Sequence, residues 1–201
     1  MKKLVVMCMC VSVISFASIT SAAEAKTPEV RKFKPKEIKM DRNYDGLVDR
    51  VEAYDEKGII IRSETDTNNN GKMDEWVFYE KGMPVKAEKD TNSDGKANTF
   101  LTYDKKGVMI KSEIDTNGDG KTNEWVYYEK GIPVKAEKDT NGDGKANTFL
   151  TYDRKGVMIK SETDTDNDGK INEWVHYKKG VPVKAEKDTN KDGKPDNWIV
   201  Y

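Results

Sequence analysis

Cysteine and histidine are almost absent from this chain of 201 residues, which has two cysteines and one histidine. Both cysteines lie at its start, where Lys2 and Lys3, an apolar run and the small residues around Ala23 follow the order of a secretory signal peptide. We therefore predict that residues 1–25 are a cleaved signal peptide and that the protein is secreted or periplasmic. Cleavage removes both cysteines, which excludes disulfides, thiolate metal sites and a cysteine nucleophile from the mature chain.

Apolar residues are also scarce, at 35% of the chain, and charged residues match them at 35%. This composition is close to that of disordered chains, so something besides a hydrophobic core must stabilise the fold. After residue 25 there is no apolar run long enough to cross a membrane. The single histidine, His176, stands where the sister repeat has Tyr127, and no nucleophile–base motif or phosphate-binding glycine loop is present, so we predict no enzymatic activity.

The most abundant feature is one polar segment that recurs seven times. The interval between copies alternates between 25 and 24 residues, so the repeating unit is 49 residues long. Residues 90–138 and 139–187 are identical at 40 of 49 positions, which is typical of arrays that grow by duplication. We number the copies as loops 1 to 7 and their residues as positions 1 to 9; they begin at Asp41, Asp66, Asp90, Asp115, Asp139, Asp164 and Asp188.

Between the loops the sequence predicts β-hairpins. Residues 98–113 and 123–138 each contain a strand-favouring run, a glycine turn and a second such run. Gly107 and Gly131 supply the positive φ that a tight hairpin requires. Alternation along the strands predicts two faces. One face is apolar, with Leu101, Tyr103, Val126, Tyr128, Val134 and Ala136, and the other is mixed, with Trp125, Tyr127, Lys135 and Glu137.

The predicted fold is all-β, an antiparallel meander of tandem hairpins. It has one strand before Asp41, six hairpins and a last strand at residues 198–201, with glycine turns on one rim and the polar loops on the other. We expect residues 26–36 to form a flexible basic lead-in and residues 37–201 to form the repeat domain. The sheet is predicted to be an open ribbon or solenoid, and propeller-like blades are the alternative.

The loop pattern has the donor spacing of a calcium site. In loop 4, Asp115, Asn117 and Asp119 place oxygens at positions 1, 3 and 5, and Gly120 at position 6 permits a sharp turn. Position 7 offers a backbone carbonyl, and Asn123 at position 9 supplies a further oxygen. Hard oxygen donors at this spacing suit Ca²⁺, whereas zinc prefers nitrogen and sulfur and Mg²⁺ requires near-octahedral geometry.

This pattern resembles the first nine positions of an EF-hand loop, and it is equally similar to the loops of dockerins, thrombospondin type 3 repeats and integrin-type propeller hairpins. An EF-hand also needs a glutamate at position 12. Only loop 1 has one, Glu52, and no flanking helix is evident. The resemblance therefore implies strand–loop–strand calcium sites that position 9 closes. In the other loops position 12 is apolar: Val77, Leu101, Val126, Leu150, Val175 and Ile199.

Every loop contributes four side chains to the predicted Ca²⁺ ligands, and loops 1, 6 and 7, which hold three carboxylates each, are expected to bind most tightly. Glutamates at position 10 (Glu75, Glu124 and Glu173) either add a ligand or solubilise a strand. The predicted ligands are Asp41, Asn43, Asp45, Asp49, Asp66, Asn68, Asn70, Asp74, Asp90, Asn92, Asp94, Asn98, Asp115, Asn117, Asp119, Asn123, Asp139, Asn141, Asp143, Asn147, Asp164, Asp166, Asp168, Asn172, Asp188, Asn190, Asp192 and Asp196.

Charge suggests a possible class of partner. The mature chain would carry 33 basic and 35 acidic residues, and 17 of the acidic ones are predicted ligands. Each Ca²⁺ adds two charges, so seven ions would change the formal charge from −2 to +12. A basic surface of this kind attracts acidic polysaccharide or another cell-surface component. The alternative is that the lysine-rich turns are solvated and keep sheets from associating. The sequence thus predicts a structural or adhesive calcium-binding protein, or else a calcium-dependent glycan-binding module, without specific nucleic-acid binding.

Overall fold

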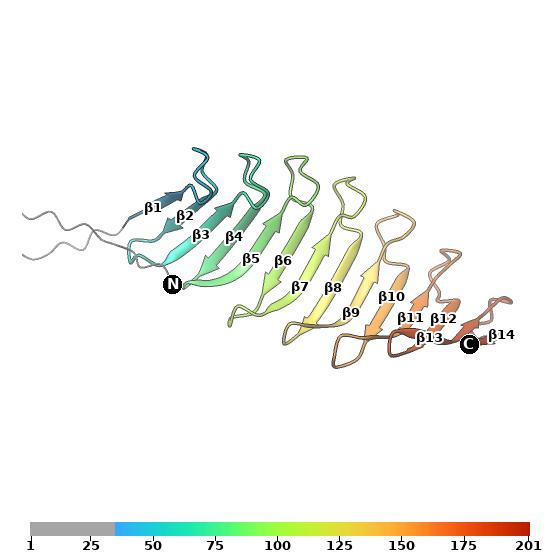
Figure 1. Ribbon diagram of the computed structural model, residues 1–201. Helices are drawn as coiled ribbons and strands as arrows, with labels where there is room; N and C mark the ends of the chain where they lie inside the picture. The colour runs from blue at the N-terminus through green and yellow to red at the C-terminus, as the bar shows by residue number, and fades with distance from the viewer. Residues whose placement is uncertain (1–34) are drawn as a thin grey trace, which may run out of the picture. The chain divides into compact units, whose positions relative to one another are not determined.

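The computed structural model describes residues 35–201; the predicted signal peptide and nearly all of the predicted lead-in lie outside the described residues. Within 35–201 the chain forms fourteen strands and no helix (Figure 1). The strands are β1 (Glu37–Met40), β2 (Arg50–Tyr54), β3 (Ile60–Thr65), β4 (Glu75–Glu80), β5 (Met83–Lys89), β6 (Thr99–Tyr103), β7 (Met109–Ile114), β8 (Glu124–Glu129), β9 (Ile132–Lys138), β10 (Thr148–Tyr152), β11 (Met158–Thr163), β12 (Glu173–Lys178), β13 (Val181–Lys187) and β14 (Asn197–Val200).

All fourteen strands belong to one sheet, and each pairs antiparallel with its neighbours in sequence. This confirms the predicted meander, including the strand before Asp41 and the last strand, which begins one residue earlier than predicted. The sheet is open, because β1 and β14 lie at its two ends and are not paired with each other. The propeller-like alternative is therefore wrong, since the register never breaks the strands into separate blades.

Two kinds of connection alternate along the sheet, and the antiparallel order places them on opposite rims (Figure 1). Each of the seven polar loops spans nine residues and joins an odd-numbered strand to the next even-numbered one. We call this side the loop rim. Short turns make the remaining connections on the other side, which we call the turn rim. The placement of glycine turns and polar loops on separate rims is thus confirmed.

On the turn rim the chain reverses in two ways. Lys81–Gly82, Lys130–Gly131 and Lys179–Gly180 are two-residue turns in which both residues have positive φ, as a type I′ hairpin requires. The other three turns are five residues long and begin with an aspartate. In one of them the Asp104 carboxylate accepts hydrogen bonds from the backbone N–H groups of Lys106 (2.8 Å) and Val108 (2.9 Å).

One face of the sheet buries small side chains beneath larger ones. Val126 lies opposite Ser112 and Ala136, as the predicted apolar face requires. Tyr128 reaches the Ser112 hydroxyl at 3.4 Å between the two oxygens. In the described part of the chain, Ala87 and Ala136 are the only buried apolar residues. A single sheet layer with so small a core gains little from hydrophobic burial, which is the usual main source of stability.

The other face carries two cross-strand ladders. In the first, Trp125 lies between Glu113 and Glu137, and aromatic residues and glutamates alternate across the sheet in this way. In the second, the Lys135 ammonium lies 5.7 Å from the Tyr127 ring centroid, within cation–π range. This face is therefore mixed in character, as its sequence predicts. The aromatic members of the first ladder are Trp76, Phe100, Trp125, Phe149, Trp174 and Trp198.

Candidate metal centres

The aspartate at position 1 organises each loop. In loop 4 the Asp115 carboxylate accepts a hydrogen bond from the N–H of Gly118 on one oxygen and from the N–H of Gly120 on the other, both at 2.7 Å. Both glycines have positive φ, 74° and 86°. In loops 1, 2, 3, 6 and 7 a residue other than glycine adopts the same left-handed conformation at position 4. The loop therefore coils around its first carboxylate, through a left-handed conformation that glycine and asparagine adopt more readily than other residues.

Positions 3 and 5 repeat this arrangement on a smaller scale. The Asn117 side-chain oxygen accepts the N–H of Asp119 (3.2 Å), and the Asp119 carboxylate accepts the N–H of Lys121 (2.8 Å). Each of these side chains therefore bonds to the backbone two residues ahead, in a local turn that Asn and Asp favour. The side-chain oxygens at positions 1, 3 and 5 are therefore held by backbone hydrogen bonds within the loop.

Position 9 closes the base of the loop. The Asn123 amide oxygen accepts both the N–H and the hydroxyl of Thr116 at position 2, each at 2.9 Å. These two bonds use the two lone pairs of that oxygen. The same pairing recurs at Asn98, Asn147 and Asn172. The geometry thus gives position 9 a structural role, and its role as a closing ligand stays a prediction.

Sequence reasoning overlooked position 2. A threonine follows the first aspartate in six of the seven loops, a regularity that the ligand pattern does not require. The structure explains it, because the threonine hydroxyl and N–H together hold the side chain at position 9. Loop 1 has Arg42 instead, and there two backbone N–H groups, from Arg42 and Asn43, bond to one oxygen of Asp49.

Two loops bring three carboxylates together. Within residues 35–201, groups of three acidic side chains with oxygens within 4.8 Å of one another occur in loop 1 and in loop 6. The first group is Asp41, Asp45 and Asp49, at positions 1, 5 and 9. The second is Asp164, Asp166 and Asp168, at positions 1, 3 and 5. Oxygen donors gathered in this way fit a hard divalent cation.

Loop 7 also has three aspartates, but it does not form such a group. The Thr189 hydroxyl lies 2.9 Å from both carboxylate oxygens of Asp196. The backbone nitrogen of Thr189 lies 3.1 and 3.2 Å from the same two oxygens. The Asp196 side chain is therefore held at the base of loop 7 and does not join Asp188 and Asp192 in a three-carboxylate group. Loops 2 to 5 have two carboxylates each, together with amide oxygens at the remaining positions.

Burial separates the predicted ligands into two sets. Apart from Ser63 and Ser112, every buried polar residue in the described part of the chain is at position 1 or position 9 of a loop. Positions 3 and 5 are exposed at the loop tips in all seven loops. The glutamates at position 10 lie outside both sets, because Glu75, Glu124 and Glu173 form ion pairs with Lys89, Lys138 and Lys187 on the neighbouring strand.

Local electrostatics keep several loop carboxylates charged. Burial raises the pKa of Asp139, but hydrogen bonds from the N–H groups of Gly144 and Gly142 outweigh it, and the net pKa lies below the ordinary value. The Thr189 hydroxyl lowers the pKa of Asp196 in the same direction. A metal site needs deprotonated carboxylates, so these hydrogen bonds favour the form that binds a cation.

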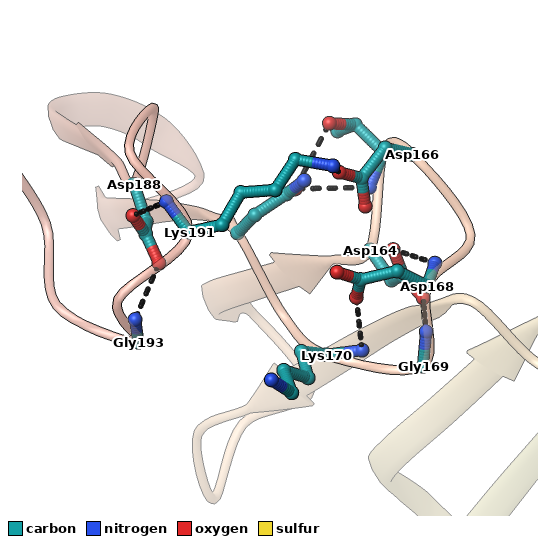
Figure 2. Close-up of polar contacts among 10 residues, drawn as sticks. Asp164, Asp166, Asp168, Gly169, Lys170, Asp188, Lys191 and Gly193 are labelled. Carbon is teal, nitrogen blue, oxygen red and sulfur yellow. Dashed lines mark hydrogen bonds and ion pairs between the residues drawn. The ribbon is translucent and has the colours of Figure 1, made fainter.

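Neighbouring loops contact each other through position 4. Ser93 in loop 3 lies 3.4 Å from Asn68 in loop 2, measured from hydroxyl to amide nitrogen. Asn167 in loop 6 accepts a hydrogen bond from Asn147 in loop 5 at 3.0 Å. Figure 2 shows the most polar contact, in which Lys191 of loop 7 reaches Asp166 of loop 6, with 2.5 Å between nitrogen and oxygen. Loops 2 and 3, loops 5 and 6, and loops 6 and 7 are therefore in direct contact along the loop rim.

No protein-family model and no curated protein matches the chain. Among the matching solved structures is the crystal structure of accessory secretory protein 1, 2 and 3 in Streptococcus pneumoniae, at 13% identity and a TM-score of 0.37. That match covers 46% of this chain and 18% of the other. Such a likeness carries no argument about function, which must come from the loops themselves. Between residues 35 and 201 there is no helix with the length and apolarity to cross a membrane.

Proposed function

We propose that the protein is an exported, non-catalytic calcium-binding repeat protein whose sheet is stabilised by Ca²⁺ bound along the loop rim. One observation carries the proposal: seven in-register loops hold oxygen donors on preorganised backbone, and two of them gather three carboxylates within 4.8 Å. Positions 1, 3 and 5 would supply side-chain ligands, and position 9 would add one where the bound ion displaces a hydrogen bond from position 2. Oxygen-only donors suit Ca²⁺ better than zinc, which prefers nitrogen and sulfur, and better than Mg²⁺, which requires near-octahedral geometry.

The size of the core explains why an ion would matter. Ala87 and Ala136 are the only buried apolar residues among those described, so hydrophobic burial contributes little. Two or three carboxylates per loop imply dissociation constants on the order of 10⁻⁴–10⁻³ M, as in extracellular calcium modules. At a free calcium concentration of about ten times that constant, each site adds about 1.4 kcal/mol. Seven independent sites would add about 10 kcal/mol, comparable to the net stability of a whole domain.

The test is a calcium titration of the full chain after removal of metal with a chelator. We expect isothermal titration calorimetry to show several sites in the range of 10⁻⁴–10⁻³ M. Far-ultraviolet circular dichroism and small-angle scattering should show the chain gaining strand structure and becoming more compact. A matched variant, Asp164→Asn with Asp168→Asn, keeps the loop 6 side chains nearly isosteric and should lose one site. Equal compactness with and without calcium, and no heat of binding, would contradict the proposal.

Export is the second part of the proposal, and it rests on the order of basic, apolar and small residues in positions 1–25. Millimolar calcium outside the cytosol would match the weak affinity that the ligand sets imply. Intact-mass measurement of the chain recovered from the medium or periplasm tests this part. We expect a mass that corresponds to loss of about 23 to 25 residues, and a full-length mass confined to the cytosol would contradict it.

A second candidate function is calcium-dependent binding of a glycan or another cell-surface component. The observation that favours it is the aromatic ladder on the mixed face, where Trp125 and Trp174 flank Phe149. Because strands lie about 4.8 Å apart, aromatic residues on alternate strands recur about every 10 Å. Trp125→Ala and Trp174→Ala should abolish retention on immobilised acidic or neutral polysaccharide if this candidate is correct. Retention that is unchanged in both variants, or that does not depend on calcium, would exclude it.

A further inference from the structure

Lys191 is placed differently from its counterparts in the other loops. It occupies position 4 of loop 7, where the other six loops have Tyr44, Asn69, Ser93, Gly118, Gly142 and Asn167, none of them charged. Lys191 has a φ of 65°, a left-handed conformation that costs a lysine free energy and that Asn or Gly adopts more readily. Its N–H bonds to the Asp188 carboxylate at 2.7 Å, so the backbone keeps the standard form of the loop.

The side chain of Lys191 leaves loop 7 and reaches the preceding loop, loop 6. Figure 2 shows it extended towards loop 6, where its ammonium lies 2.5 Å from a carboxylate oxygen of Asp166. Asp166 belongs to the group of three carboxylates with Asp164 and Asp168. The ammonium therefore places one positive charge beside one of the two three-carboxylate groups of the loop rim. A lysine ammonium and a divalent cation make competing demands on the same oxygens.

The Lys191 contact is also exposed enough to be released. The side chain of Lys191 is 60% exposed and that of Asp166 is 30% exposed. Exposed ion pairs of this kind contribute little net stability, so the ammonium loses little when it moves into water. A bound divalent ion would repel it, and the side chain is long enough to turn outward without any change in the backbone of loop 7.

We propose that Lys191 is a tethered cation that sets the calcium affinity of loop 6. It neutralises part of the Asp164–Asp166–Asp168 group when calcium is scarce, and calcium must displace it to bind. This inference rests on the proposed function, because it concerns the same calcium sites. Loop 6 then binds calcium more weakly than its three carboxylates alone would allow. Occupation of loop 6 also releases the contact that links loop 7 to it.

The experiment uses the glycine at position 6 of each loop as a separate reporter. The N–H groups of Gly169 and Gly120 bond to the first carboxylate of loops 6 and 4, respectively. Two-dimensional ¹⁵N–¹H NMR of the full chain during a CaCl₂ titration therefore gives one midpoint for each loop. In Lys191→Asn we expect the Gly169 midpoint to fall about tenfold in calcium concentration, the size of effect that a positive charge a few ångströms from a divalent ion has at an exposed site. The Gly120 midpoint should stay unchanged.

Two control variants separate the contact from the charge alone. Lys194→Asn removes the same charge from the same loop. The hydrogen bond from Lys194 to Asp192 comes from the backbone N–H (2.9 Å), which asparagine also has. It should move the Gly169 midpoint less than about twofold. Lys191→Arg keeps the charge and should leave that midpoint near the wild-type value. Asn is well suited to the main substitution, because Asn167 adopts the same left-handed conformation at position 4 of loop 6.

The outcomes distinguish this inference from the proposed function. If the other glycine reporters respond to calcium and the Gly169 midpoint is the same in Lys191→Asn and wild type, the inference is wrong and the calcium function stands. An equal shift in Lys194→Asn overturns it as well, because the effect would then follow net charge. If no loop glycine responds to calcium in the wild type, the proposed function itself fails, and the inference fails with it.

Discussion

The two rims of the sheet reverse the chain by different means. On the turn rim some reversals take two residues, as at Lys130–Gly131. The others take five residues, which the carboxylate of the first residue closes with hydrogen bonds, as at Asp104. On the loop rim every reversal takes nine residues. The loops contain 17 aspartates against eight lysines and arginines, a formal charge of −9, whereas the turns have four acidic and eight basic residues, a formal charge of +4.

This difference shows that the loops do more than connect strands. A chain reversal needs only the two residues of a type I′ turn. A nine-residue loop that buries carboxylates therefore adds a free-energy cost that chain reversal alone does not require. The cost recurs seven times in the chain. The loops also hold nearly all of the buried polar side chains in the described part of the molecule. The loop rim is therefore where the acidic groups of the described chain gather and where, under the proposed function, ions would add stability. The predictions below test this contrast between the rims.

Acid should produce the largest effect, because it acts on both rims. Hydrogen bonds from the N–H groups of Val108 and Lys106 hold the pKa of Asp104 below its ordinary value on the turn rim. On the loop rim the pKa of Asp139 is lowered despite its burial. A lowered folded-state pKa means that the stabilisation is fully present above the unfolded pKa of about 3.9 and is lost as the pH falls through the folded value. The free energy of unfolding should therefore be flat near neutral pH and fall below about pH 4.

Urea unfolding between pH 7 and pH 2, followed by circular dichroism with chelator and with excess calcium, measures this loss. The difference between the two curves isolates the loop rim, because protonation of its carboxylates also releases the ion. We expect this difference to disappear with acid before the chelator curve reaches its minimum. A calcium-dependent gain that persists at pH 2 would contradict the assignment of the ions to carboxylates.

Truncation of one aspartate on each rim should give the next largest effect. Asp115 is 7% exposed and accepts two backbone N–H groups at 2.7 Å, so Asp115→Ala leaves both donors without their partner. We expect a loss of about 3 kcal/mol in calcium, since hydrogen bonds to charged groups contribute about 1.5–3 kcal/mol each. Asp104→Ala on the turn rim should cost less than half as much, because water can replace its bonds. Equal losses in urea unfolding would mean that the two rims are held in the same way.

Much of this contrast could be predicted from the sequence. The constant register of the repeat predicted the number of strands. Gly131 and Gly107 marked the turns, because glycine readily adopts the positive φ that both the two-residue and the five-residue turns contain. The side-chain faces followed from alternation along each strand. The pattern also identified which residues have oxygens near the loop tips. Periodicity and turn chemistry are local properties, so a single sequence displays them.

The remaining details depend on geometry that a pattern does not contain. Residue type gives Asn123 an amide oxygen, but only the folded loop shows that this oxygen faces Thr116. Loop 7 has as many aspartates as loop 6, yet Asp196 is turned to Thr189, and the loop forms no three-carboxylate group. The contact between Lys191 and Asp166 depends on the lateral spacing of adjacent loops, which the sheet sets.

Removal of one hydroxyl at the base of a loop should have a moderate effect. Thr140→Val keeps the side-chain shape and loses the 2.9 Å bond from the hydroxyl to the Asn147 amide oxygen. We expect a loss of about 1 kcal/mol in the free energy of unfolding, the usual net value of one hydrogen bond. The control is Thr151→Val in β10, a strand position opposite Lys135 and Lys160, where valine suits the sheet. Equal effects of the two variants would show that position 2 does not hold the loop.

The smallest expected effect lies on the turn rim and has the opposite sign. Lys130 has a φ of 52°, which a type I′ turn requires and which asparagine adopts more readily than lysine. Lys130→Asn should therefore stabilise the chain by about 0.5 kcal/mol in urea unfolding, independently of calcium, because the turn contains no predicted ligand. Lys155→Asn is the control, since Lys155 has the same charge on the same rim but is not among the described residues with positive φ. An equal gain in both variants would trace the effect to charge, and a gain that required calcium would mean that the two rims are not independent.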